Sequence, residues 1–160
     1  MCNHQRLAGT QDSGALYRHL IPDRVLVSAC LCGISCRYDG RSKPVERFVK
    51  MLLEGKCVPF CPEKLGGLTT PREPAVLSGG DGFAVLDGTG RVILRDVEGD
   101  VTDEFIRGAE LSVRYASVLN PMFIYLKEKS PSCGIRCGMN MPGVAAAALI
   151  RSGFRVESAD

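Results

Sequence analysis

Tryptophan is absent from this sequence, histidine occurs only twice, and neither sign of charge dominates. The 20 basic and 18 acidic residues are mixed along the chain, so no basic stripe predicts nucleic-acid binding by charge alone. The longest apolar run, Val144 to Ile150, is too short to cross a bilayer, and residues 1–24 contain no apolar stretch of signal-peptide length. We therefore expect a cytoplasmic protein that avoids membranes and acts on a small molecule.

Cysteine is abundant by comparison, with eight in 160 residues. Because 45% of the residues are hydrophobic, a chain of this length can bury a self-supporting core, and reduced thiols are expected rather than a disulfide framework. We expect one domain over residues 25–160, preceded by a loosely attached polar extension over residues 1–24. A single reduced cysteine is most often a small buried hydrophobe, so only the positions of the cysteines can indicate a function.

Predicted strands and helices alternate along this domain. The apolar patterns predict strands at residues 25–29, 56–60, 122–126 and 154–157, and helices at residues 44–54, 102–119 and 144–151. Residues 83–87 and 91–96 flank Gly88-Thr89-Gly90, which predicts a β-hairpin, and the segment from Cys61 to Gly82 is predicted to be an ordered loop. The order predicts an α/β fold: a mainly parallel sheet flanked by helices, with a β-hairpin addition.

Three cysteines follow three of the predicted strands. Cys30 comes directly after the first strand, Cys61 directly after the second, and Cys133 lies in the loop after the third. Because the carboxyl ends of parallel strands meet at one edge of a sheet, we expect these three thiols to lie close together. Chance readily places one cysteine in such a loop, but three loops of the same kind with one each favour a metal site.

The kind of metal follows from the ligand types and their spacing. The chain has no Cys-x-x-Cys unit, and His4 and His19 both lie in the polar extension, which disfavours structural zinc. Thiolates from scattered loops suit an iron–sulfur cluster, and three ligands for four irons leave one iron open to a substrate. Cys57 lies inside a predicted strand and is most simply a core residue. Three further cysteines stay open as a fourth ligand or as packing: Cys32, Cys36 and Cys137.

Several motifs are shared with a known family. They are Val27-Ser28-Ala29-Cys30-Leu31, Cys36-Arg37-Tyr38-Asp39-Gly40, Cys61-Pro62-Glu63-Lys64-Leu65-Gly66-Gly67-Leu68, Thr70-Pro71-Arg72 and Ser130-Pro131-Ser132-Cys133-Gly134. In this order they resemble the thiouracil desulfidase family, formerly a domain of unknown function. The resemblance implies an α/β domain with a 4Fe-4S cluster on Cys30, Cys61 and Cys133. It also implies a non-redox reaction in which water replaces the sulfur of a thiolated pyrimidine and sulfide is released.

Such a reaction needs a group that activates water and groups that orient the heterocycle. Glu63, two residues after Cys61, is the candidate general base, and Ser130, with Ser132 as the alternative, is the candidate hydrogen-bonding residue. Weaker candidates for substrate contacts are Ser28, Arg37, Asp39 and Lys43. The expected partner is a thiolated base, nucleoside or nucleotide, and the balanced charge makes tRNA less favoured.

One alternative function stays open. A non-catalytic cluster-binding module for sulfur trafficking or redox sensing is favoured by the additional cysteines and by the segment from Gly134 to Gly143, which is shorter than in the family. A fourth thiolate would close the cluster to substrate. Glu63 beside Cys61 favours the enzyme.

Overall fold

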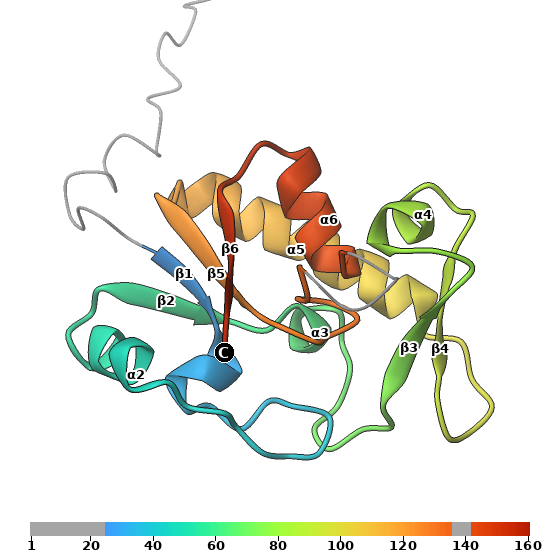
Figure 1. Cartoon of the computed structure of the whole chain (residues 1–160), viewed down its shortest axis with the longest axis horizontal. Coiled ribbons are helices and arrows are strands. Elements are labelled where there is room, and N and C mark those ends of the chain that lie inside the picture. The colour runs from blue at the N-terminus through green and yellow to red at the C-terminus, as the bar shows by residue number, and fades with distance from the viewer. Residues whose placement is uncertain (1–24, 136–141) are drawn as a thin grey trace, which may run out of the picture.

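A computed structural model describes residues 25–135 and 142–160 (Figure 1). The polar extension predicted for residues 1–24 therefore lies outside the described residues, as does Cys137. The central sheet has the strand order β2-β1-β5-β6, and all three strand pairings are parallel. Its strands are β1 (Val25–Ser28), β2 (Cys57–Phe60), β5 (Phe123–Lys127) and β6 (Val156–Ala159).

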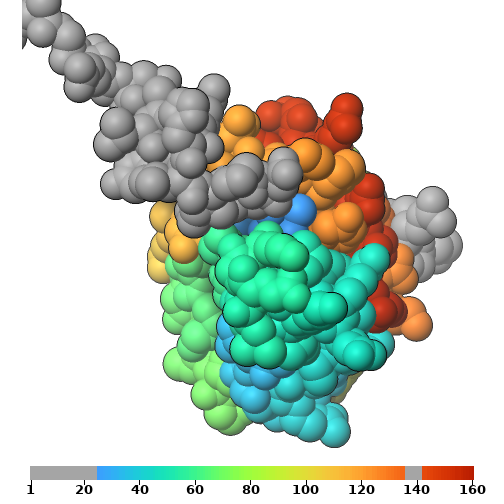
Figure 2. All heavy atoms as spheres, turned by 90° about the vertical axis from the view of Figure 1, so that its left-hand side faces the viewer, coloured from blue at the N-terminus to red at the C-terminus, as the bar shows by residue number. Residues whose placement is uncertain are grey.

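Helices cover both faces of this sheet because residues in each strand alternate between the faces. On one face, Val25 and Val27 pack with Phe48 of α2 (Glu46–Leu53). Seen from the side where α2 lies, this helix and the segment before it form much of the surface (Figure 2). On the other face, Leu26 and Ile124 pack against two further helices, α5 (Thr102–Leu119) and α6 (Val144–Arg151).

The short helix α3 (Pro62–Leu65) follows β2 and packs against α5 with almost no space between the two backbones. A Cβ atom on Gly66 would lie 2.0 Å from the carbonyl oxygen of Glu104, and one on Gly108 would lie 2.2 Å from that of Pro62. Only glycine fits at both contacts. They fix the position of α3, which matters because α3 carries Glu63.

The predicted hairpin is present, but its first arm is a different segment. Strand β4 (Arg91–Leu94) pairs antiparallel with β3 (Ala75–Ser78), which lies in the segment that was predicted to be a loop. Residues predicted as the first arm form α4 (Gly82–Leu86) instead. The reason is local: Asp81 caps this helix by accepting a hydrogen bond from the Ala84 amide at 3.0 Å, and Val85 is buried.

The α/β fold class is confirmed: a parallel sheet flanked by helices, with a small antiparallel addition. Helix α6 has the predicted bounds, whereas β6 begins two residues later than predicted. Within the two described ranges, no helix is long and apolar enough to span a membrane.

Candidate metal centre

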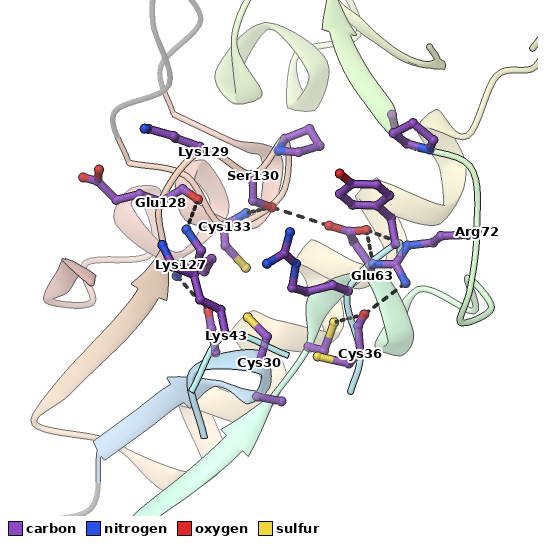
Figure 3. A pocket seen from close by; sticks show the side chains of 18 of the residues that line it. Cys30, Cys36, Lys43, Glu63, Arg72, Lys127, Glu128, Lys129, Ser130 and Cys133 are labelled. Carbon is purple, nitrogen blue, oxygen red and sulfur yellow. Dashed lines mark hydrogen bonds and ion pairs between the residues drawn. The ribbon is translucent and has the colours of Figure 1, made fainter. Parts of the chain in front are cut away.

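A cavity of about 410 Å³ opens where β1, β2 and β5 end (Figure 3). Most of its lining comes from the ends of these strands and the segments that follow them, because parallel strands direct their carboxyl ends to one edge of the sheet, and Ala75 and Arg95 of the antiparallel addition also contribute. Ala29, Phe60 and Pro131 contribute apolar surface to the lining. The cavity is thus a partly apolar pocket at the place where ligands of open α/β sheets bind.

The three cysteines predicted to converge all line this cavity. Cys30 lies in the 3₁₀-helix η1 (Ala29–Cys32), which continues directly from β1. Cys61 precedes the first residue of α3, and Cys133 lies in the turn that follows β5. Cys30 and Cys133 are buried, and Cys61 is partly exposed. Residues more than a hundred positions apart in the sequence thus bring three thiols to one cavity.

Cys36 also lines the cavity, and it lies between two of these thiols. Its side chain is hydrogen-bonded to those of Cys30 and Cys61, and its backbone oxygen lies 4.0 Å from the Cys61 sulfur. These hydrogen bonds lower the pKa of Cys61 to about 7, against the opposing effect of burial, and they also lower the pKa of Cys30. The same contacts raise the pKa of Cys36. Cys36 therefore keeps its proton, and its single S–H donates to one of the two neighbouring sulfurs at a time.

Cys32 and Cys57 lie elsewhere, in the core beneath α2. The Cys57 sulfur is 3.9 Å from the backbone oxygen of Phe48, as expected for a core residue. Burial raises the pKa of Cys57, and burial together with the neighbouring Cys57 raises the pKa of Cys32 to about 12. Of the three cysteines left open by the sequence, the structure thus places Cys36 in the cavity and Cys32 outside it.

Ser28, at the end of β1, connects the sheet to Cys133. Its hydroxyl oxygen accepts a hydrogen bond from the Lys127 amide at 3.0 Å, and its side chain is also hydrogen-bonded to the Cys133 thiol. Burial nevertheless raises the pKa of Cys133, because a thiolate there loses its hydration. Ser28 lines the cavity, so it remains a candidate for substrate contact while also orienting a cysteine.

The thiols are better arranged for a cluster than for a single ion. Among the described residues, no three His, Cys, Asp or Glu side chains converge closely enough to hold one metal ion. A multi-iron cluster has a different requirement, because each thiolate binds its own iron and the sulfurs can stand further apart. An all-thiol donor set on separate walls of one cavity fits that requirement.

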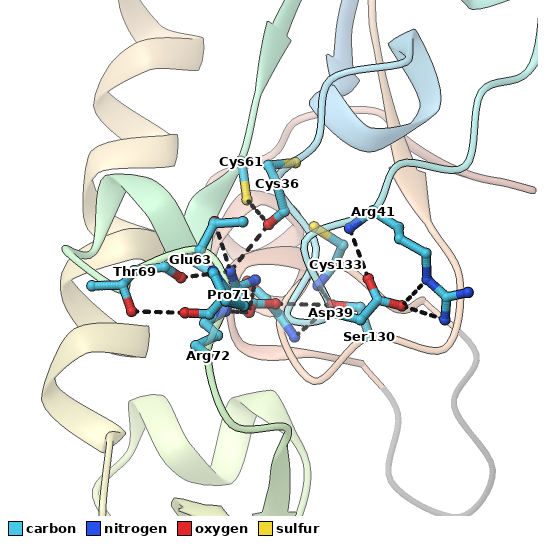
Figure 4. A network of polar contacts seen from close by, with 12 residues as sticks. Cys36, Asp39, Arg41, Cys61, Glu63, Thr69, Pro71, Arg72, Ser130 and Cys133 are labelled. Carbon is cyan, nitrogen blue, oxygen red and sulfur yellow. Dashed lines mark hydrogen bonds and ion pairs between the residues drawn. The ribbon is translucent and has the colours of Figure 1, made fainter.

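Glu63 is held beside these thiols in a polar network (Figure 4). Its Oε2 atom accepts a hydrogen bond from Arg72 Nε at 2.7 Å and a second from Arg72 Nη2. Its Oε1 atom lies 3.5 Å from the Ser130 hydroxyl. Glu63 and Ser130 both line the cavity, whereas Ser132 is buried and lies outside its lining. Between the two candidate serines, the position favours Ser130.

The three other weak substrate-binding candidates lie on the loop after η1. Arg37 and Lys43 line the cavity. Asp39 forms ion pairs with Arg37 at 3.3 Å and with Arg41 at 2.9 Å, and it is absent from the lining. Lys43 lies 3.8 Å from Asp160. Asp39 thus stabilises the loop through ion pairs, and Arg37 and Lys43 lie next to any ligand in the cavity.

Sequence reasoning missed several residues of the lining. Arg72 was part of a recognised motif but received no role, and Lys127, Lys129 and Arg95 were not singled out at all. Lys127 is the last residue of β5 and Lys129 lies two residues beyond it, so their place at a strand end was a signal that could have found them. No comparable signal marks Arg95, which follows the antiparallel strand β4.

This geometry defines an α/β protein with a thiol-lined cavity at the carboxyl edge of a parallel sheet. The chain belongs to the 2-thiouracil desulfurase family, whose sequence profile matches residues 25–160. It is 43% identical over 143 residues to YbbK of Bacillus subtilis (strain 168), an uncharacterized protein, and the match covers 84% of this chain and 94% of that one. A solved structure of a [4Fe-4S]-dependent thiouracil desulfidase, TudS, is also similar, with a TM-score of 0.71 and 37% identity over 85% of this chain and 90% of that chain. The predicted family is thereby confirmed.

Proposed function

We propose that this protein is a desulfidase that holds a 4Fe-4S cluster on Cys30, Cys61 and Cys133 and removes sulfur from a thiolated pyrimidine. The observation that carries the proposal is the convergence of these three thiols, from three separate strand ends, in a cavity that also contains Glu63 and Ser130. The TudS structure, a [4Fe-4S]-dependent thiouracil desulfidase by its title, supports it.

The donor set suits the cofactor. Soft thiolates favour iron–sulfur clusters, and three of them leave one of four irons without a protein ligand. When bound, such a cluster would supply a Lewis-acidic iron and an acceptor for sulfur. The protein's own residues then have two tasks, which are to activate a water molecule and to orient the pyrimidine.

Glu63 is suited to the first task. One of its carboxylate oxygens is bonded to Arg72, and the other is directed toward Ser130, so a water molecule next to Ser130 can give its proton to Oε1. Ser130 is held in turn, because its hydroxyl oxygen accepts hydrogen bonds from the amides of Ser132 at 3.2 Å and Cys133 at 3.1 Å. Ser130 therefore binds the water or the ring from a fixed position.

The cations at the cavity suit the second task. Arg37 and Lys43, together with Lys127 and Lys129, line the cavity, so they can pair with the phosphate of a bound nucleotide. Both Lys43 and Lys127 are paired with Asp160, which leaves part of their charge already compensated. We therefore include the free base, the nucleoside and the nucleotide as substrates and favour tRNA less.

The fourth thiol in the cavity favours a second candidate function. If Cys36 bound the remaining iron, the cluster would have no open position, and the protein would serve in sulfur trafficking or redox sensing. The two candidates differ in one measurable property, which is turnover by protein with a full cluster.

Anaerobic reconstitution with iron and sulfide tests the function. We expect about four irons per chain, and release of sulfide from thiouracil, 4-thiouridine or the 5′-monophosphate of 4-thiouridine. A full cluster without sulfide release from any of the three would refute the desulfidase and leave the non-catalytic module.

Replacement of Glu63 with Gln tests the proposed base. The variant should keep its iron and sulfide content, because Glu63 is not a proposed ligand, and should lose about 10²- to 10⁴-fold in kcat. Unchanged turnover would show that another group activates the water.

A further inference from the structure

Arg72 is the most enclosed cation of the cavity, and its role is unassigned. Only 8% of its side chain is exposed, although arginine is among the residues that are almost never buried without a partner. Its guanidinium group connects three segments: the helix that carries Glu63, the loop that carries Cys36, and its own loop.

The bonds of this guanidinium group are divided between two functions. Nε and Nη2 both donate to Oε2 of Glu63, whereas Nη1 donates to the backbone oxygens of Cys36 at 3.1 Å and Thr69 at 3.0 Å and approaches the Thr70 hydroxyl at 3.3 Å. Nη1 thus anchors the group to the protein. The other two nitrogens are directed at a single oxygen of Glu63.

The second oxygen of Glu63 faces a group whose hydrogen bonding is nearly complete. The Ser130 oxygen already accepts two backbone amides, so its own proton is the part left to bond, and Oε1 of Glu63 lies 3.5 Å away. The Arg72 contact therefore leaves Oε1 as the oxygen of Glu63 that is directed at Ser130.

We propose that Arg72 is a positioning residue of the desulfidase: by holding Oε2, it keeps Oε1 of Glu63 directed at Ser130 and the cavity. The expected loss of turnover rests on the proposed function. The expected change in the position of the Glu63 carboxylate rests on the hydrogen bonds alone. Lysine cannot substitute, because one ammonium group cannot hold Oε2 of Glu63 and also bond to two backbone carbonyls in the fixed geometry of a guanidinium fork.

The kinetic test compares Arg72→Ala and Arg72→Lys with Arg151→Ala. Arg151 is a control for the loss of an arginine–carboxylate pair outside the cavity: it makes two hydrogen bonds to Asp87, at 2.8 and 3.2 Å, its side chain is 46% exposed, and neither residue lines the cavity. We expect both Arg72 variants to keep their iron content and to lose about 10²-fold in kcat, the cost of a small misplacement of a reacting group. Arg151→Ala should turn over as the wild type does, and added guanidinium, but not ammonium, should restore part of the activity of Arg72→Ala.

A double variant separates positioning from a general structural role. If Arg72 acts through Glu63, adding Arg72→Ala to Glu63→Gln should lower kcat no further, whereas a separate role would make the two losses multiply. Multiplying losses would overturn the proposal.

Crystal structures decide the geometric part even without turnover. In Arg72→Ala, the Glu63 carboxylate should leave its place beside Ser130, and a carboxylate that stays there would overturn the proposal. If the wild type with a full cluster is inactive, the proposed function fails, and this comparison alone still supports or refutes Arg72 as the residue that orients Glu63.

Discussion

In each of two pairs of cysteines that are close in sequence, one cysteine lines the cavity and the other packs in the core. Cys30 and Cys32 are two residues apart in η1, and Cys57 and Cys61 lie at the start of β2 and just after its end. Cys30 and Cys61 line the cavity, whereas Cys32 and Cys57 pack in the core beneath α2. Within these two pairs the pKa shifts are opposite: the hydrogen bond with Cys36 lowers the pKa of Cys61 to about 7, and burial raises that of Cys32 to about 12.

Backbone geometry explains this division. A 3₁₀-helix has three residues per turn, so positions two apart point about 120° away from each other. Cys30 and Cys32 therefore cannot both face the cavity. Along an extended strand four residues cover about 13 Å, which separates Cys57 from the edge where Cys61 lies. Location relative to the strand end, rather than residue type, distinguishes a candidate ligand from a core thiol.

The largest effect is expected from removing a cavity cysteine of the proposed ligand set. Replacing Cys30, Cys61 or Cys133 with Ala leaves two thiolates, and we expect reconstituted protein to lose nearly all its iron and all its sulfide release. Iron and sulfide assays with visible absorbance measure this. Full iron content in any of these variants would remove that residue from the ligand set.

A smaller effect is expected at Cys36, the remaining cavity thiol. Its replacement with Ala removes one S–H hydrogen bond, shared between the Cys30 and Cys61 sulfurs and worth about 1 kcal/mol. The cluster should still form, with turnover reduced by about tenfold or less. Iron loss as complete as in Cys133→Ala would instead make Cys36 a fourth ligand and would favour the non-catalytic module.

Much of this comparison could be predicted from the sequence, because it follows from strand order. Cys30, Cys61 and Cys133 each follow an apolar strand, and the crossovers between those strands suit helices, so a common edge follows from the parallel topology. Helix α6 was predicted with its bounds because an alanine-rich segment lies between Gly143 and Gly153.

Features set by loop conformation could not be predicted. Cys32 and Cys36 share a loop, and only the turn of η1 directs one to the core while the following segment brings the other to the cavity. Arg72 and Glu63 meet across a nine-residue separation that has no helical or strand periodicity. Residues 83–87 were predicted as a strand because Gly88-Thr89-Gly90 resembles a hairpin turn, and the helix cap at Asp81, which depends on a single side-chain hydrogen bond, was not recognised.

The smallest effect is expected in the core pair. Replacing Cys57 with Ala removes a buried sulfur next to Cys32 and Phe48, so the free energy of unfolding of the cluster-free protein should fall by about 1 kcal/mol. Urea denaturation of that form measures this without the complication of a bound cofactor. Cys32→Ala should behave similarly, and the double variant should lose less stability than the sum of the two single losses, because the side chains are in contact.

Iron content and turnover should equal those of the wild type in all three variants, since neither sulfur reaches the cavity. Loss of iron in any of them would mean that the core thiols support the cluster and that the division between the two groups is incomplete.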